Sequence, residues 1–335
     1  MNHSKFLTRC IQLANYGRGT TSPNPLVGAV IVHNGRIIGE GYHRKAGEPH
    51  AEVMAINSVK DKELLKYSTL YCSLEPCAHH GKTPPCCELI TSHAIPSVVI
   101  GTTDPHDKVD GKGIDHLVQH GVNVEFAPSA KPYQELNEVF WINRTKNRPF
   151  FTLKWAETSS GHIDSVRNHY EDALKISGPL AAIKSHQLRA QVDGILITSK
   201  TAFKDRPKLN LRFWGGNNPV PIILKSSEYP IEDQWLLSLN TKSVIISENF
   251  EPHCIHISSN PKELASWTTA LLDLGLNHIL VEGGSRLLQN FIDHGLADAI
   301  HTYISNDTIV DGVKAPKGPR IGPQNRLGKD AYVRH

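Results

Sequence analysis

The sequence predicts a two-domain α/β protein, and three observations lead to this prediction. The chain has 335 residues, whereas a single hydrophobic core stops growing near about 250–300 residues. Apolar residues with helical and strand periods alternate through both halves, as in layered α/β domains. Between the halves, Pro128, Pro132 and Pro149 interrupt the pattern around a connecting helix. We therefore expect one domain over residues 1–146 and a second over residues 147–335.

In the first half we expect a helix, a hairpin and then alternating helices and strands. Apolar residues at helical spacing predict a helix over residues 3–17, and the turn pair Asn34-Gly35 joins two strands. Pro49 suits the first turn of the next helix. The other elements are strands 27–32, 36–42, 69–73, 97–101 and 122–126, and helices from 50, over 86–91, over 114–120 and up to 146.

The second half alternates in the same way. Residues 150–156 form an apolar strand interrupted by Lys154, and the strand over 278–281 ends in Glu-Gly-Gly-Ser before a helix. Glycines let the backbone approach an anion and the free amides of a helix start point at it, so this turn is a candidate phosphate cradle. Glycines at such a turn also serve chain geometry alone. The other elements are strands 193–198, 221–224 and 243–247, and helices 180–190, 262–274 and 287–293.

Composition and charge argue against several classes of protein. Apolar residues make up 39% and charged residues 21% of the chain, as in soluble globular proteins. The formal charge of +3 is spread without a basic run, which disfavours nucleic acid as a partner. No apolar run approaches the roughly 20 residues that span a membrane, and no signal-peptide stretch begins the chain, so we expect a cytoplasmic protein. Its six cysteines indicate metal ligands or buried thiols, with Cys10 and Cys72 in the core.

A candidate metal site lies in two pieces of the first half. His50 and Glu52 stand two positions apart, and Cys77 and Cys86 follow with eight residues between them. One histidine and two cysteines occupy three corners of a zinc tetrahedron and leave the fourth for water, as in catalytic sites. A His-x-Glu followed by Pro-Cys is typical of zinc deaminases of nucleobases, in which the glutamate moves protons and the usual cysteine gap is two residues.

A structural zinc site is the alternative interpretation. It requires a fourth protein ligand, for which His79, His80 or Cys87 are candidates. Such a site gives no reason for Glu52, and closed sites usually carry paired Cys-x2-Cys spacings. We therefore expect one catalytic Zn²⁺ held by His50, Cys77 and Cys86.

The first half resembles the deaminase domain of the bifunctional riboflavin-biosynthesis deaminase/reductase family. The resemblance rests on residues 77–86, Cys-Ala-His-His-Gly-Lys-Thr-Pro-Pro-Cys, on residues 23–30, Pro-Asn-Pro-Leu-Val-Gly-Ala-Val, and on Gly-Tyr-His at 41–43. It implies a three-layer cytidine-deaminase-like fold and hydrolytic removal of the 2-amino group of a diaminopyrimidinone ribosyl phosphate, with Glu52 as general base and then acid. The implied substrate contacts are Asn24, His43, His79 and Lys82, with Lys82 at the phosphate.

The second half resembles the reductase domain of the same family. The matching stretches are Lys154-x-Ala156, His-Gln-Leu-Arg-Ala at 186–190, residues 201–212, Glu-Gly-Gly at 282–284 and residues 312–316. They imply a dihydrofolate-reductase-like fold in which NADPH reduces the ribosyl group to ribityl. The residues implied to face the cofactor are Thr201, Asp205, Gly283, Gly284 and Ser285. Those implied to face the substrate are Lys154, Arg189, Leu209, Arg212 and Glu282, with both arginines clamping phosphate and Lys154 or Glu282 handling a proton.

Two departures from the family pattern leave an alternative open. Ser160 stands where the family has an acid, and Lys175 stands where it has a tryptophan. Either the Lys175 stem replaces part of the ring area, or the second domain is a degenerate reductase used for assembly. A zinc-organised or RNA-binding module is a third hypothesis, disfavoured by the even charge and scarce clustered aromatics. We expect a small phosphorylated pyrimidine as the ligand, no nucleic-acid or membrane partner, and a homo-oligomer.

Overall fold

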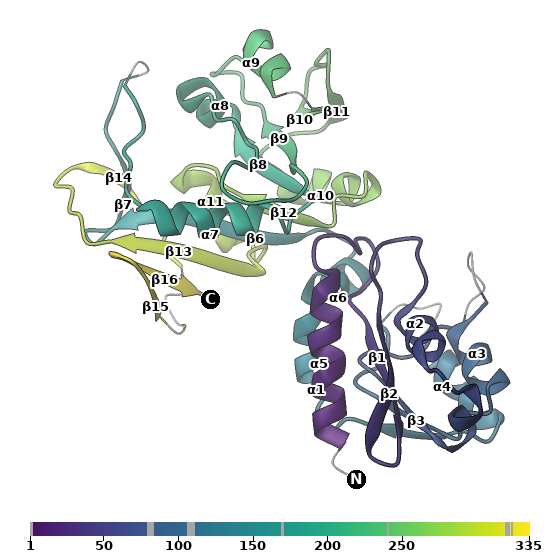
Figure 1. Ribbon diagram of the computed structural model, residues 1–335. Helices are drawn as coiled ribbons and strands as arrows, with labels where there is room; N and C mark the ends of the chain where they lie inside the picture. Colours follow the sequence, from purple (N-terminus) through teal and green to yellow (C-terminus); the bar gives the residue numbers. More distant parts are fainter. Residues whose placement is uncertain are drawn as a thin grey trace. The chain divides into compact units, whose positions relative to one another are not determined.

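The computed structural model describes residues 3–78, 84–105, 111–168, 171–239, 241–318, 322 and 324–335. The chain divides into two compact units, Met1–Asn147 and Arg148–His335, each of which carries its own sheet (Figure 1). Within the described ranges, no helix is long and apolar enough to cross a membrane.

The first unit is built on a five-stranded sheet with the order β2-β1-β3-β4-β5. Strand β1 pairs antiparallel with β2 and β3, whereas β3, β4 and β5 run parallel. The strands are β1 (Gly28–His33), β2 (Arg36–Tyr42), β3 (Thr69–Cys72), β4 (Ser97–Ile100) and β5 (Asn123–Phe126). The helices are α1 (His3–Ala14), η1 (Asn15–Gly17), α2 (Ala51–Ser58), η2 (Lys62–Tyr67), α3 (Cys86–Ser92), α4 (Lys112–Gln119), α5 (Lys131–Leu136) and α6 (Glu138–Lys146).

Alternating side chains of this sheet bury two separate cores. On β1, Val30 and Val32 pack with α1 and with Tyr133 of α5, whereas Ala29 and Ile31 pack with α2, α3 and α4. This division follows from the two-residue period of a strand. Helices therefore cover both faces of the sheet (Figure 1), and the expected three-layer fold is confirmed.

Close packing fixes helix α2 on strand β2. A Cβ at Gly41 would lie 2.4 Å from the backbone nitrogen of Ala55, so only glycine allows this approach. At the other end of α2, the Lys62 ammonium donates hydrogen bonds to the carbonyls of Ile56, Asn57 and Val59 at 2.6, 2.9 and 2.7 Å. These bonds satisfy acceptors that a helix C-terminus leaves unpaired.

The second unit is built on a nine-stranded sheet with the order β11-β10-β9-β8-β12-β6-β13-β16-β15. The strands from β11 to β13 run parallel, and β16 and β15 are antiparallel. The strands are β6 (Phe150–Thr158), β8 (Gly194–Thr198), β9 (Val220–Leu224), β10 (Val244–Ser247), β11 (Ile255–Ser258), β12 (His278–Val281), β13 (Ala299–Ser305), β15 (Gln324–Leu327) and β16 (Asp330–Arg334), and β7 (His162–Ser165) pairs separately with β14 (Gly312–Lys314).

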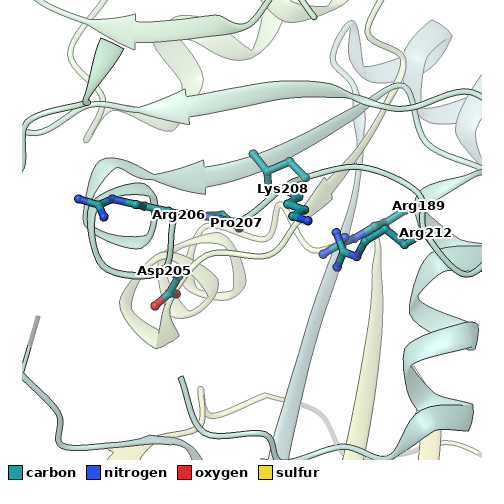
Figure 2. Close-up of a pocket in the computed structure, with 7 residues that line it drawn as sticks. Arg189, Asp205, Arg206, Pro207, Lys208 and Arg212 are labelled. Atoms are coloured by element: carbon teal, nitrogen blue, oxygen red, sulfur yellow. The ribbon is translucent and has the colours of Figure 1, made fainter. Parts of the chain in front are cut away.

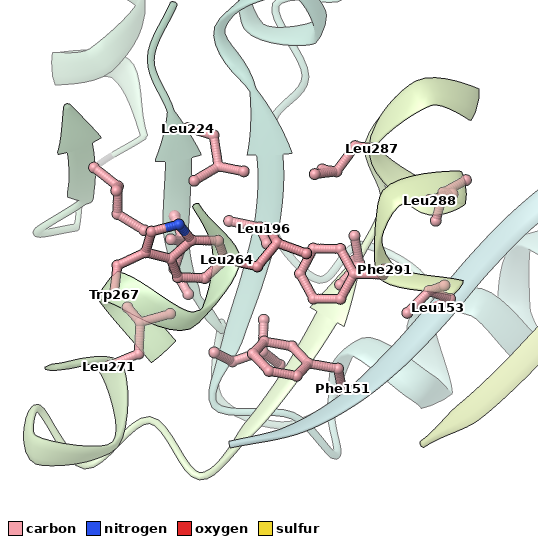
Figure 3. Close-up of a cluster of buried hydrophobic side chains, with 14 of the residues drawn as sticks. Phe151, Leu153, Leu196, Leu224, Leu264, Trp267, Leu271, Leu287, Leu288 and Phe291 are labelled. Carbon is pink, nitrogen blue, oxygen red and sulfur yellow. The ribbon is translucent and has the colours of Figure 1, made fainter. Parts of the chain in front are cut away.

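Helices cover both faces of this second sheet. They are α7 (Pro179–Arg189), α8 (Ser199–Asp205), α9 (Asp233–Ser238), α10 (Leu264–Asp273) and α11 (Ser285–Asp293). The larger core, drawn in Figure 3, joins Trp267 of α10 and Phe291 of α11 to Phe151 of the sheet. A second core contains Leu188 of α7 and Trp235 of α9, and a small third one joins Ala181 of α7 to Tyr303 and Tyr332 of the sheet. The expected mixed α/β class is confirmed for this unit.

Several elements of the second unit have no counterpart in the sequence analysis: β7, α8, α9, β11 and β13–β16. The most important of them is β13, which lies between β6 and β16. Its sequence, Ala-Ile-His-Thr-Tyr-Ile-Ser, lacks a clear apolar period because His301 and Thr302 are polar yet buried. The Tyr332 hydroxyl and His301 Nδ1 lie 2.7 Å apart and form a hydrogen bond. This bond joins residues on two different strands, so the local sequence of β13 does not reveal it.

His301 predicts acid sensitivity of the second unit. Burial, with Arg334 nearby, lowers the pKa of His301 to about 3, against about 6.5 for the unfolded chain. As the pH falls from 6.5 towards 3, the unfolded state takes up this proton and the folded state does not, so stability decreases. We expect a loss on the order of 2 kcal/mol from this group between pH 7 and 4.5. The free energy of unfolding, measured with denaturant at pH 7 and at pH 4.5, should differ less between the two pH values in His301→Gln than in the unsubstituted protein.

Candidate active sites

The three predicted metal ligands converge in the first unit. His50 is the N-cap of α2, and its Nδ1 lies 3.3 Å from Cys86 Sγ and 3.5 Å from Cys77 Sγ. The three donor atoms all lie within 4.8 Å of one another. A tetrahedral zinc site separates a nitrogen and a sulfur ligand by about 3.6 Å, so this donor set fits the ion.

The surroundings of Cys77 favour its thiolate form. Cys77 Sγ accepts a hydrogen bond from the backbone nitrogen of Cys86 at 3.4 Å, at the start of α3. The hydrogen bond with the Cys86 thiol, and then the one with His50, lowers the pKa of Cys77, whereas the same contact and burial raise the pKa of Cys86. Cys77 is therefore the thiol that more readily becomes a thiolate, which is the form that binds zinc.

Cys87 is not placed as a fourth ligand. Its side chain is buried in the core that α2, α3 and α4 share, and its backbone nitrogen donates to Cys77 O at 3.2 Å. Among the residues that the structure describes, His50, Cys77 and Cys86 form the one cluster of this kind. The remaining candidates for a fourth ligand, His79 and His80, lie outside the described residues.

Glu52 lies on the same helix as the metal ligand His50, two positions further along the chain. It occupies the first turn of α2 and is 3% exposed. Burial raises the pKa of Glu52 to about 7, and the Cys86 thiol contacts its carboxyl group. A carboxyl group of this kind can accept and return a proton near neutral pH, which is what a general base and acid requires.

Two of the predicted substrate contacts lie beside this cluster. His43 is buried, and its ring stands edge-on to the His50 ring with centroids 5.6 Å apart. His43 Nδ1 lies 3.2 Å from the carbonyl oxygen of Pro49, and His43 Nε2 lies 3.1 Å from Asn24 Nδ2. These partners make Nδ1 the donor and Nε2 the acceptor of a neutral ring, since burial also lowers the pKa of His43. The other two contacts, His79 and Lys82, lie outside the described residues.

In the second unit, three charged residues meet at the carboxyl end of β12. Glu282 follows β12, Arg189 ends α7, and Lys154 projects from the neighbouring strand β6. Arg189 Nε and Nη2 donate to the two oxygens of Glu282 at 3.1 and 2.5 Å, and Lys154 Nζ lies 3.9 Å from Glu282 Oε1. Ligand sites of open α/β sheets commonly form at such strand ends.

The ionisation of this trio follows from its burial and its charges. Although burial opposes it, Arg189 and then Lys154 hold the pKa of Glu282 at about 2. Burial lowers the pKa of Lys154, which Glu282 partly offsets. Glu282 is therefore an anion at neutral pH, and Lys154 is an ammonium that loses its proton more easily than a surface lysine.

A cationic cavity of about 370 Å³ adjoins the trio. Its lining residues, shown in Figure 2, are Arg189, Asp205, Arg206, Pro207, Lys208, Leu209 and Arg212. Arg189 Nη1 donates to Asn210 O at 3.3 Å and Arg212 Nη1 to Asn210 Oδ1 at 2.8 Å, so both arginines are held on one residue. A lining with four cations and one carboxylate suits a phosphate group.

The sequence suggests that Arg189 binds a phosphate, whereas in the structure its guanidinium binds Glu282. Two of its guanidinium nitrogens already bind Glu282, so this fork is committed to the carboxylate. Arg212 is held from the other side, where its backbone nitrogen donates to His186 Nδ1 at 3.1 Å. Leu209, also predicted to face substrate, is buried with a left-handed φ of 46° at the bend of this loop.

The predicted cofactor residues lie at the ends of β8 and β12. Thr201 stands in the first turn of α8, where its backbone nitrogen donates to Thr198 Oγ1 at 3.3 Å. Gly284 is the N-cap of α11, and a Cβ there would meet nothing within 4 Å. This open space beside Ser285 and the first amides of a helix fits a phosphate of a dinucleotide. At Gly283 a Cβ would lie 2.5 Å from Leu287 Cδ2, so a larger residue would displace the Leu287 side chain.

Asp205 and Ser160 are held by contacts within the second unit, whereas Lys175 is exposed. Asp205 forms an ion pair with Arg167, whose side chain is also 2.7 Å from Asp164. Ser160 Oγ accepts from the backbone nitrogen of Ile309 at 2.9 Å and lies 3.0 Å from its carbonyl oxygen. Ser160 therefore fastens the turn after β6. Lys175 is exposed on the second unit.

Comparison with known proteins matches both halves of the chain. Residues 1–102 match the cytidine and deoxycytidylate deaminase zinc-binding region, and residues 149–309 match the RibD C-terminal domain. The riboflavin biosynthesis protein RibD of Aquifex aeolicus is 34% identical over 318 residues, which covers 92% of this chain and 88% of that protein. The Escherichia coli RibD is 31% identical over 328 residues, covering 91% and 88%.

Solved structures agree along the whole chain. A diaminohydroxyphosphoribosylaminopyrimidine deaminase/5-amino-6-(5-phosphoribosylamino)uracil reductase of Thermotoga maritima superposes with a TM-score of 0.86 at 34% identity, covering 99% of this chain and 97% of that one. RibD of Acinetobacter baumannii gives 0.85 at 26% identity, covering 98% and 97%. These matches support a chain with both enzymatic domains over a deaminase that carries a degenerate second domain.

Proposed function

The chain belongs to the RibD family of riboflavin-biosynthesis enzymes, and we propose that it acts on the two substrates for which the Thermotoga maritima relative is named. It is a bifunctional enzyme with a zinc-type deaminase domain and an NADPH-dependent reductase domain. In this proposal residues 1–146 deaminate 2,5-diamino-6-ribosylamino-4(3H)-pyrimidinone 5′-phosphate, and residues 147–335 reduce the ribosyl group of the product to ribityl. The convergence of His50, Cys77 and Cys86 beside Glu52 carries the first assignment.

In the deaminase site, His50, Cys77 and Cys86 would hold the zinc ion. Bound zinc supplies the Lewis acidity that makes water nucleophilic at neutral pH. Glu52 takes the proton of the attacking water and returns it to the departing amine. Asn24 and His43 orient the pyrimidine, because their polar atoms lie beside the cluster. His79 and Lys82 complete the proposed substrate contacts.

In the reductase site, the charged trio supplies the proton that accompanies opening of the sugar ring. Bound NADPH supplies the hydride. Of the two candidates, Lys154 is the proton donor, since Glu282 is ionised at neutral pH and has no proton to give. Glu282 orients the Lys154 ammonium, and Arg189 holds Glu282 in place.

The cationic cavity would bind the substrate phosphate. Arg212 and Lys208 line it without an ion pair to Glu282, so they are the cations proposed to meet the phosphate, with Arg189 behind them and Leu209 shaping the loop. The dinucleotide would contact Thr201, Gly283, Gly284 and Ser285. Asp205, also proposed to face the cofactor, lines the cationic cavity.

We further propose that the enzyme works in the cytoplasm as a homo-oligomer. All six cysteines are free thiols, which suits a reducing compartment. Cell fractionation and light scattering of the purified protein test these two points. Recovery in a membrane or secreted fraction, or a monomeric mass at all concentrations, would contradict them.

Metal removal separates the two proposed activities. We expect the purified enzyme to release one ammonia and oxidise one NADPH for each diamino substrate converted. After treatment with a strong zinc chelator, ammonia release should stop and return with added Zn²⁺, because zinc is needed for water activation. Reduction of the already deaminated substrate should continue throughout. Ammonia release that survives complete zinc removal would contradict the deaminase proposal.

A further inference from the structure

Glu75 is a buried carboxylate that the proposed chemistry does not use. It follows β3, is 3% exposed, and receives four backbone hydrogen bonds. Its Oε2 accepts from the nitrogens of Asp104 and Gly111 at 3.3 and 3.1 Å. Its Oε1 accepts from those of Gly113 and Ile114 at 3.0 and 3.4 Å. The Glu75 side chain therefore binds the backbone at residue 104 and at residues 111, 113 and 114.

Three of these four amides belong to the start of α4. Gly111 is the N-cap of this eight-residue helix, and Gly113 and Ile114 lie in its first turn. The first amides of a helix have no intrahelical acceptors and carry partial positive charge, so a carboxylate satisfies them well. Glu75 thus caps α4 from a distant part of the chain.

The contact between α4 and the metal-ligand loop is unusually close. A Cβ at Gly113 would lie 1.9 Å from the carbonyl oxygen of Pro76, so α4 could not reach this position with any larger residue. The backbone of Glu75 is also fixed, since its nitrogen donates to Thr102 O at 3.0 Å. The side chain of Glu75 therefore holds it to α4, and its backbone holds it to the segment that follows β4.

Cys77 follows directly and is held from the other side by α3. Its carbonyl oxygen accepts from the nitrogen of Cys87 at 3.2 Å, and its sulfur accepts from that of Cys86 at 3.4 Å. We infer that Glu75 is a positioning residue for the zinc site, which locks the loop 75–77 onto α4 so that the Cys77 thiolate faces His50 and Cys86. This inference rests on the proposed zinc deaminase site.

Glu75→Gln tests the inference because it preserves size while replacing one amide-binding oxygen by an NH₂ group that faces backbone N–H groups. Loss of an outer residue that orients a metal ligand typically costs roughly 10–100-fold in metal affinity or activity. We therefore expect zinc transfer to a chelator to be roughly 10–100-fold faster, measured at a temperature at which the variant remains folded. The visible spectrum of the Co²⁺-substituted protein should shift, because the Cys77 ligand moves.

Glu40→Gln is the matched control in the same unit. Glu40 is a carboxylate that accepts two hydrogen bonds from Arg9 at 2.7 and 2.9 Å, away from the metal ligands. The Glu40→Gln variant should have a lower free energy of unfolding, but its zinc release and Co²⁺ spectrum should equal those of the unsubstituted protein. Reductase turnover on deaminated substrate reports, within each sample, that the second unit is intact.

Gly113→Ala provides a second test if Glu75→Gln does not fold. It pushes α4 away from Pro76 while keeping the Glu75 charge, and we expect faster zinc release again. Zinc release and a Co²⁺ spectrum equal to those of the unsubstituted protein, accompanied only by a lower melting temperature, would overturn the inference and leave Glu75 as a helix cap. A protein that binds zinc tightly but releases no ammonia would contradict the proposed function alone, since the zinc-release comparison would still stand.

Discussion

Glu52→Gln is expected to reduce ammonia release by about 10²–10⁴-fold, the range found when a general acid–base group is lost. The glutamine keeps the shape of a side chain that is 3% exposed, but it cannot accept the proton of the attacking water. Zinc binding should persist, because Glu52 is not among the three donors that converge. The measurement is the rate of ammonia release by zinc-loaded variant and unsubstituted enzyme on the diamino substrate.

The second active site is the internal control for this variant. Glu52 lies in the first unit and the charged trio in the second, so NADPH oxidation on deaminated substrate should be unchanged. If the variant releases ammonia within a few-fold of the normal rate while holding zinc, Glu52 is not the proton carrier.

Glu282→Gln should produce the second largest effect. It removes the anion that compensates Lys154 and Arg189, whose side chains are only 19% and 12% exposed. Removing one partner of a buried ion pair typically destabilises by about 3–5 kcal/mol, since a charge remains buried without compensation. We expect reductase turnover to fall by at least about 100-fold as the Lys154 ammonium loses its orientation, whereas ammonia release continues.

Asp298→Asn distinguishes lost chemistry from lost stability. Asp298 pairs with Arg148 at 2.6 Å in the same unit, and both side chains are 8% exposed. Its substitution should destabilise the unit to a similar extent, yet leave reductase turnover intact below the melting temperature. Equal losses of turnover in the two variants would show that Glu282 acts only through stability.

The zinc site could be predicted from the sequence because its information is local. His50 and Glu52 are two positions apart, and Cys77 and Cys86 are separated by eight residues, so ligand type and spacing were enough to define the chemistry. The geometry of His50, Cys77 and Cys86 agrees with that prediction. The function of the second half depended on resemblance, which the match to the RibD C-terminal domain bears out.

Features that depend on distant partners could not be predicted. Arg189 was expected at a phosphate, but its guanidinium faces Glu282, which is 93 positions away in the chain. The role of Glu75 could not be predicted because its partners, the backbone amides of residues 104, 111, 113 and 114, do not depend on side-chain type. Strand β13 was missed because its buried polar residues find their partners only across the sheet.

One measurement tests most directly the claim that two sites act in sequence. Ammonia and NADPH are followed together after the diamino substrate is mixed with an excess of enzyme. We predict that ammonia appears first and that NADPH is consumed after a lag, in equal final amounts. With Glu52→Gln, NADPH oxidation should be lost on the diamino substrate and restored by the deaminated one. NADPH oxidation that begins without ammonia release would contradict the account.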